Sequence, residues 1–142
     1  MERNEEKKNS VFIATSLDGY ISDKNGGIDW PYDKPVFVLS NKLSEIPESL
    51  QGKAFLIKGN LIDILNKIHE KGYYRLYIDG GTTIRNFLKE DLIDEMTLTT
   101  IPILLGGGTS LFSELPNEMK FELIGTKTYL NQIIQNHYKR QK

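Results

Sequence analysis

The chain has 142 residues, no cysteine and a formal net charge of -1, with 18 basic and 19 acidic residues. The lack of cysteine excludes disulfides, thiolate metal sites and cysteine nucleophiles, and the balanced charge argues against binding to nucleic acid. Apolar runs such as Ile101–Leu105 are too short to span a bilayer, and the charged first residues lack the apolar core of a signal peptide. We therefore expect a cytoplasmic protein without a membrane or nucleic-acid partner.

The alternation of apolar runs and turn residues predicts one domain. Residues 1–9 are rich in charge and predict a flexible N-terminal segment, followed by a single domain at residues 10–142. Short apolar runs that end in turn residues are typical of buried strands. They predict strands at Val11–Ala14, Val36–Leu39, Ala54–Ile57, Leu76–Ile78 and Met96–Ile101, with a shorter extended piece at Tyr20–Ile21.

Two helices are expected among these strands. Apolar residues recur at helical spacing within Leu61–His69, and Gly72 is a suitable end for that helix. The second helix is predicted to begin at Thr82 or Thr83, because a hydroxyl side chain can cap the first turn.

The C-terminal region has a different pattern. Phe121–Thr126 and Gln132–Tyr138 mix polar and apolar residues and predict a terminal antiparallel pair of strands. Strands that alternate with helices, followed by a hairpin, indicate an α/β fold with a mostly parallel sheet and an antiparallel edge.

The strongest local motif joins a strand to a helix through two glycines. The strand leads through Asp79-Gly80-Gly81 into a helix that opens with Thr82 and Thr83. Open parallel sheets bind ligands at the carboxyl ends of their strands, and a helix N-terminus offers free N–H groups to a phosphate. A tight turn with a capped helix has the same appearance in sequence, so both interpretations stay open.

Asp18 follows the first strand, within the segment Ser16–Ile21. A carboxylate at a strand end can orient a polar substrate or relay a proton. The alternative is an ordinary Asp-Gly turn.

Two further glycine-rich segments also have two interpretations. Gly26–Trp30 is either a lid that carries an aromatic ring or a surface loop whose Trp30 fills the edge of the core. Ile101–Phe112 contains three consecutive glycines, which either line a pocket with N–H groups or form a flexible connector. The only histidines, His69 and His137, lack metal-ligand spacing, so no metal site is expected.

Several sequence segments occur in one order between Ser10 and Tyr138. They are Phe12–Ile21, Gly27–Trp30, Lys34–Ser40, Tyr77–Gly81, Asp94–Met96 with Ile101–Pro102, and Leu105–Gly108. This ordered set resembles the dihydrofolate-reductase-like superfamily, in the RibD C-terminal domain group, whose better-known members reduce a ribosylated pyrimidine in riboflavin biosynthesis. The resemblance implies a three-layer α/β fold, with flanking helices on a mostly parallel central sheet and antiparallel C-terminal edge strands.

The resemblance also implies an NADPH site. In relatives the glycine-threonine turn contacts the cofactor diphosphate, residues of the first strands flank the nicotinamide, and a third group lies beside the adenosine end. The implied cofactor-binding residues are Ala14, Ile21, Leu39, Ser40, Asn41, Lys58, Gly59, Gly80, Gly81, Thr82 and Thr83. Asp18 and Trp30 are the implied catalytic residues and would face the substrate. Relatives often pair as homodimers.

The sequence departs from the family pattern between Trp30 and Pro35. Family members have a helix and a further strand there, and that segment supplies a phosphate-binding turn and one wall of the substrate pocket. Here only four residues separate Trp30 from Pro35, and such a link extends to roughly 13–14 Å. A shortened substrate pocket is therefore expected.

Three functions are compatible with this sequence. The first is an NADPH-dependent reductase that transfers hydride to a pterin-like or ribosylated pyrimidine substrate. The second is a nucleotide-binding remnant that no longer catalyses the reaction, which the gap favours. The third is an interaction module that pairs with a second copy through its terminal strands.

Overall fold

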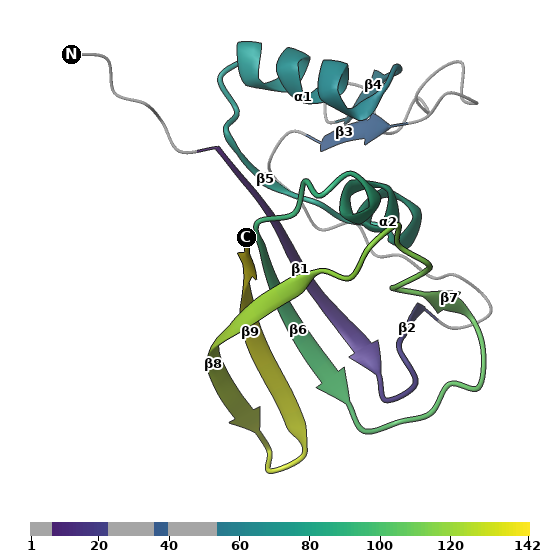
Figure 1. The fold of residues 1–142 in the computed structure, drawn as a ribbon. Coiled ribbons are helices and arrows are strands. Elements are labelled where there is room, and N and C mark those ends of the chain that lie inside the picture. Colours follow the sequence, from purple (N-terminus) through teal and green to yellow (C-terminus); the bar gives the residue numbers. More distant parts are fainter. Residues whose placement is uncertain (1–6, 23–35, 40–53) are drawn as a thin grey trace. The chain divides into compact units, whose positions relative to one another are not determined.

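The structure is a computed structural model that describes residues 7–22, 36–39 and 54–142 (Figure 1). The chain divides into two compact units. Unit 1 comprises Met1–Gly27 and Tyr74–Lys142, and unit 2 comprises Ile28–Tyr73. The single-domain organisation at residues 10–142 stays a prediction.

Unit 1 is built on a five-stranded sheet with the strand order β5-β1-β6-β9-β8. Its strands are β1 (Lys8–Ser16), β5 (Arg75–Tyr77), β6 (Glu95–Ile101), β8 (Lys120–Tyr129) and β9 (Ile133–Gln141). β1 pairs in parallel with β5 and β6, whereas β9 pairs antiparallel with β6 and β8. The predicted α/β fold with an antiparallel C-terminal edge is confirmed.

The core of unit 1 forms between the sheet and α2 (Gly81–Lys89). Ile84, Phe87 and Leu88 are buried, and their spacing places them on one face of the helix. Val11 of β1 and Met96 of β6 are buried as well, while most of their neighbours along each strand are less buried. One face of the sheet therefore supplies the core, because side chains alternate between the two faces of a strand.

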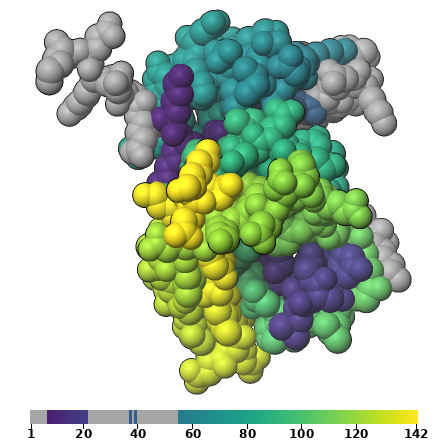
Figure 2. All heavy atoms as spheres, in the orientation of Figure 1, coloured from purple at the N-terminus to yellow at the C-terminus, as the bar shows by residue number. Residues whose placement is uncertain are grey.

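A second, smaller ladder of unit 1 joins β2 (Tyr20–Ser22) to β7 (Thr109–Ser110) in antiparallel register. On the face shown in Figure 2, the purple atoms around β2 lie against green atoms of the segment that contains β7. The sequence predicted the extended piece at Tyr20–Ile21 but not β7, because two residues are too short to show an alternating pattern.

Unit 2 contains β3 (Val36–Leu39), β4 (Ala54–Ile57) and α1 (Leu61–Glu70). The two strands pair in parallel and have the bounds expected from sequence. Three apolar side chains on one face of α1, Ile64, Leu65 and Ile68, are buried. The helix begins after Asn60, whose side chain accepts a hydrogen bond from the N–H of Asp63.

Two sequence predictions need correction. β1 begins at Lys8, inside the segment expected to be flexible, because the Lys8 N–H donates to Tyr74 O at 2.9 Å and the Asn9 side chain donates to Leu92 O at 2.8 Å. The N-cap of α2 is Gly80, with no side-chain cap, rather than Thr82 or Thr83. Among the described helices, none has the length and apolar character needed to cross a membrane.

Candidate functional site

The candidate site lies at one edge of the unit 1 sheet. β1, β5 and β6 run parallel, so their carboxyl ends meet at the same edge. The segments that follow them contain Asp18, Gly80 and Gly106, respectively. Parallel sheets bind ligands at this edge, and the sequence motifs identified above are therefore brought together by the topology.

The start of α2 presents unpaired backbone donors. The first helical hydrogen bond runs from the N–H of Ile84 to Gly80 O at 2.9 Å. Within the described part of the chain, the N–H groups of Gly81, Thr82 and Thr83 have no hydrogen-bond partner. Gly80 has φ 89°, a conformation that favours glycine and turns the chain from β5 into the helix. The helix end therefore has the donors and partial positive charge that bind a phosphate group.

Gly81 is closely surrounded by side chains of three other residues. A Cβ atom placed there would lie 2.9 Å from Ile21 Cδ1, 2.9 Å from Arg85 Nη1 and 3.0 Å from Thr109 Cγ2. Ile21 belongs to β2 and Thr109 to β7, so the small ladder rests directly on the first turn of α2. A side chain at this position would therefore have to displace the ends of these three side chains.

Arg85 ties the same two elements together. Its guanidinium donates to the backbone carbonyl of Ser110 and, at 3.2 Å, to Thr82 Oγ1. A cation is thereby held beside the open end of α2. Sequence reasoning did not identify Arg85, although its position one helical turn after Thr82 was an available signal.

Asp18 links the turn after β1 to the triple-glycine segment. Its carboxylate accepts hydrogen bonds from Ser16 Oγ at 2.5 Å, Leu105 N at 3.2 Å and Gly106 N at 3.0 Å. The Ser16 hydroxyl, and then the N–H groups of Gly106 and Leu105, hold the pKa of Asp18 below its usual 3.8. Asp18 is therefore an ionised acceptor at neutral pH.

Ser16 was not singled out from sequence, but it completes this turn. Its hydroxyl accepts from the N–H of Tyr20 at 3.0 Å while it donates to Asp18. The N–H of Leu17 donates to Ile103 O at 2.8 Å, so the turn and the start of the Ile101–Phe112 segment are joined on both sides.

The other predicted cofactor residues fall into separate places. Ala14 is exposed on β1 opposite Thr99 of β6. Leu39 ends β3, and Lys58 and Gly59 follow the end of β4, so these residues share one edge of the unit 2 ladder. Trp30, Ser40 and Asn41 lie outside the described residues. Across residues 7–22, 36–39 and 54–142 there is no group of three His, Asp or Glu side chains that could hold a metal.

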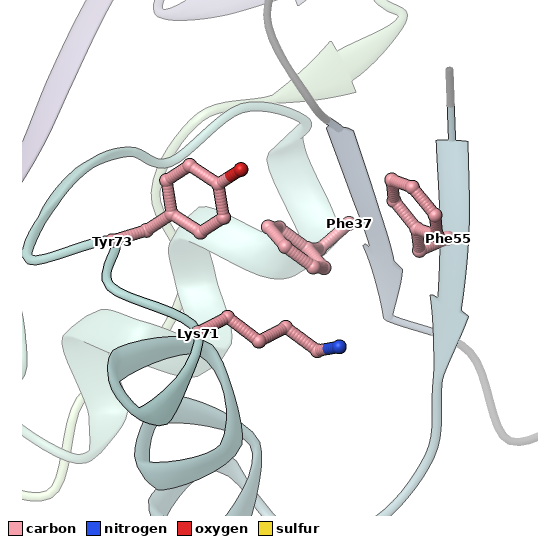
Figure 3. A pocket seen from close by; sticks show the side chains of 4 residues that line it. All are labelled: Phe37, Phe55, Lys71 and Tyr73. Carbon is pink, nitrogen blue, oxygen red and sulfur yellow. The ribbon is translucent and has the colours of Figure 1, made fainter. Parts of the chain in front are cut away.

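Unit 2 also contains an aromatic hollow of about 220 Å³ (Figure 3). Phe37 of β3, Phe55 of β4, and Lys71 and Tyr73 after α1 line it. The Phe37 ring lies 5.8 Å from the ring of Phe55 and 5.8 Å from that of Tyr73, measured between centroids. None of these residues was predicted as part of a site.

Comparison with known proteins identifies the family. The RibD C-terminal domain family matches residues 34–135. The chain belongs to this family. It is 34% identical to the uncharacterized protein YwjB of Bacillus subtilis (strain 168), over 95% of this chain and 99% of YwjB.

Solved structures agree with this assignment. A structure described as a riboflavin biosynthesis protein of Shewanella sp. PV-4 is 43% identical in sequence to this chain and has a TM-score of 0.90. The match covers 95% of this chain and 99% of that chain. Dihydrofolate reductase from Enterococcus faecalis in complex with NADP(H) has a TM-score of 0.70 at 14% identity, over 95% of this chain and 97% of that chain. The second similarity shows the fold alone, which is dihydrofolate-reductase-like.

The alignment with YwjB also bears on the expected gap. It spans 174 positions, whereas this chain has only 142 residues, so at least 32 aligned positions have no residue here. The family match begins at residue 34, directly after the predicted gap. Both findings agree with a shortened chain relative to its family.

Proposed function

We propose that this protein is an NADPH-dependent reductase that transfers hydride to a pterin-like or ribosylated pyrimidine substrate. The observation that supports this most strongly is the open first turn of α2, where the N–H groups of Gly81, Thr82 and Thr83 have no partner among the described residues. The guanidinium of Arg85 stands beside that turn. This arrangement fits the diphosphate of a dinucleotide.

We assign the parts of the cofactor to residues as the family resemblance implies. We assign the diphosphate to Gly80, Gly81, Thr82 and Thr83, and the nicotinamide to the region of Ala14 and Ile21. Leu39, Ser40, Asn41, Lys58 and Gly59 are assigned to the adenosine end. NADPH would supply the hydride, and the protein would supply alignment and exclusion of water.

Asp18 is assigned a positioning role toward the substrate side of the site. Its lowered pKa keeps it ionised at neutral pH, so it accepts hydrogen bonds and does not donate a proton. Its bonds to Leu105 and Gly106 fix the segment that enters the triple glycine. We assign Trp30 to the substrate face of the site. We also propose that the protein is cytoplasmic and that it forms a homodimer, as relatives often do.

A second candidate function is nucleotide binding without turnover. The gap of at least 32 positions relative to YwjB favours it, because the missing segment supplies one wall of the substrate pocket in relatives. The two candidates share the cofactor site and differ only in the chemical step.

Titration with NADPH and NADH tests both candidates. Trp30 is the only tryptophan, so quenching of its fluorescence and energy transfer to the reduced nicotinamide report a single place. Saturable binding with NADPH tighter, together with substrate-dependent oxidation of NADPH, supports the reductase. Binding without oxidation of NADPH across pterin and ribosylated pyrimidine substrates supports the second candidate. No binding up to roughly millimolar cofactor, with the protein shown to be folded, would contradict both.

A further inference from the structure

The opposite edge of the unit 1 sheet contains a second cavity. Its volume is about 280 Å³, and residues of β1, β5, β6 and β9 line it. Lys8, Arg75 and Glu95 are the first residues of their strands, so the cavity lies at the amino ends of β1, β5 and β6. The candidate cofactor site lies at the carboxyl ends, and the two sites are therefore distinct.

The cavity arises from a small residue among large ones. Ser10 of β1 is flanked along its strand by Lys8 and Phe12, which point to the same face because side chains alternate. Across the sheet its register partners are Tyr77 of β5 and Glu95 of β6. The short side chain of Ser10 therefore forms the floor of a depression whose walls are four long side chains.

One wall of the cavity is an ion-pair network. Glu95 Oε1 lies 2.7 Å from Lys8 Nζ, and Glu95 Oε2 lies 3.1 Å from His137 Nε2. Both carboxylate oxygens are therefore engaged. Arg75 at the same rim is exposed, and its guanidinium has no ion pair or hydrogen bond within the described residues. The cations Lys8 and Arg75 outnumber the one carboxylate, and the cavity favours an anion.

The other wall is aromatic. The side chains of Phe12 and Tyr77 flank Ser10 and are 62% and 77% exposed. Exposed rings of this size at a cavity offer stacking surfaces for a planar group. The volume of about 280 Å³ is just below the usual range for small-molecule sites of roughly 300–1,000 Å³, so it suits a single ring with an anionic substituent.

We propose that this cavity binds a small aromatic anion, whose ring stacks on Tyr77 and Phe12 above Ser10 and whose charged group meets Arg75. The site is independent of the proposed reductase activity. No group at the candidate cofactor site takes part in it.

Phenyl phosphate and inorganic phosphate are the probes, titrated into the full chain labelled with ¹⁵N and followed by amide chemical shifts. Phenyl phosphate is expected to bind with a dissociation constant of roughly millimolar or tighter and to shift the amides of Ser10, Tyr77 and Thr97. Inorganic phosphate is expected to bind at least roughly tenfold more weakly, because it lacks the ring. Shifts confined to Gly81–Thr83 would place the anion at α2 and overturn the proposal.

Variants separate the charge, the ring and the volume. Arg75→Gln is expected to weaken the binding of phenyl phosphate roughly tenfold. Tyr77→Ala is expected to weaken the binding of phenyl phosphate but not that of inorganic phosphate. Ser10→Leu fills the floor and should abolish binding while every charge remains. Lys127→Gln is the matched control, because it removes a cation from β8 on the same sheet face, outside the cavity, and should leave affinity unchanged.

Thermal melts establish that each variant is folded. Binding that Arg75→Gln and Ser10→Leu leave unchanged in folded protein would overturn the proposal. Equal affinity for the two probes would also overturn it, since the aromatic wall would then have no role.

Discussion

The two helices of this protein begin in opposite ways. α1 starts at Asn60, whose side chain accepts a hydrogen bond from the N–H of Asp63 at 2.9 Å and so caps one N–H group of the first turn. α2 starts at Gly80, which has no side chain for this purpose, and three N–H groups of its first turn stay without a partner in the described residues. The first end has a side-chain cap, and the second has none.

This difference separates a capped helix start from the one at which we propose that the cofactor binds. An N-cap side chain stabilises a helix by only roughly a few tenths of a kcal/mol relative to glycine, so the glycine-started α2 gives up little stability. In α2 the positions near the missing cap are held by β2, β7 and Arg85 instead. A phosphate site requires a helix end that its neighbours hold in place and whose N–H groups are free to bind a ligand.

Filling the open end should have the largest effect. Gly81→Val places atoms where Ile21, Arg85 and Thr109 already lie within 3.0 Å of a Cβ. We expect a destabilisation of about 1–3 kcal/mol from overpacking and loss of NADPH binding, measured by thermal melts and by the fluorescence titration. Gly125→Val is the control, because a Cβ there meets nothing within 4 Å. Unchanged affinity in Gly81→Val would show that the α2 end is not the diphosphate site.

Removal of the cation beside the open end should have the next largest effect. Arg85→Gln loses the charge-assisted bonds to Ser110 O and Thr82 Oγ1, and we expect roughly tenfold weaker NADPH binding. Lys89→Gln removes a cation from the last turn of the same helix and should leave affinity unchanged. An equal loss in both variants would point to a general charge effect.

Asp18→Asn should have a smaller effect that depends on pH. The native state lowers the pKa of Asp18 below 3.8, so its carboxylate stabilises the fold above roughly pH 4 and loses that contribution as the pH falls through the lowered pKa. The melting temperature of Asp18→Asn should therefore lie below that of the wild type at pH 7. The difference between the two melting temperatures should become smaller toward pH 3. A difference in melting temperature that is constant over this range would contradict the proposed role of the charge. Glu114→Gln is the control, because this exposed carboxylate has no hydrogen-bond or ion-pair partner among the described residues.

Removal of the N-cap side chain of α1 should have the smallest effect on function. Asn60→Ala removes the cap of α1 and should cost about 1 kcal/mol of stability, measured by denaturant unfolding. NADPH affinity should stay within a factor of about two, since the cap contributes no proposed ligand contact. A large loss of affinity would mean that α1 has a role in the site that its N-terminus does not reveal.

Local patterns predicted most elements of the fold. The strands at Val36–Leu39 and Ala54–Ile57 are confirmed with the expected bounds, because a continuous apolar run between turn residues leaves few other choices. The helix ending near Gly72 is confirmed as well. The Thr82 or Thr83 cap was wrong, because a hydroxyl near a helix start is a frequent cap and nothing local shows that Gly80 turns the chain first.

The candidate site was predicted only in part. Gly80 and Gly81 stood out because a double glycine after a strand is a strong signal. Arg85 and Ser16 did not, since each acts through a partner on another element or in a turn. The site roles of all these residues stay predictions, and Trp30, Ser40 and Asn41 also lie outside the described residues.

The sequence by itself determined the family, the order of the strands and helices except for β7, and the double glycine before α2. Only the tertiary structure decided that Asp18 holds Gly106, 88 positions away in sequence, and that Ile21 and Thr109 close on Gly81. The cavity above Ser10 was decided in the same way, by the neighbours that β5 and β6 bring to it. The physical reason is that these contacts depend on the register between distant strands, which is set by burial of the whole sheet face and not by any local pattern.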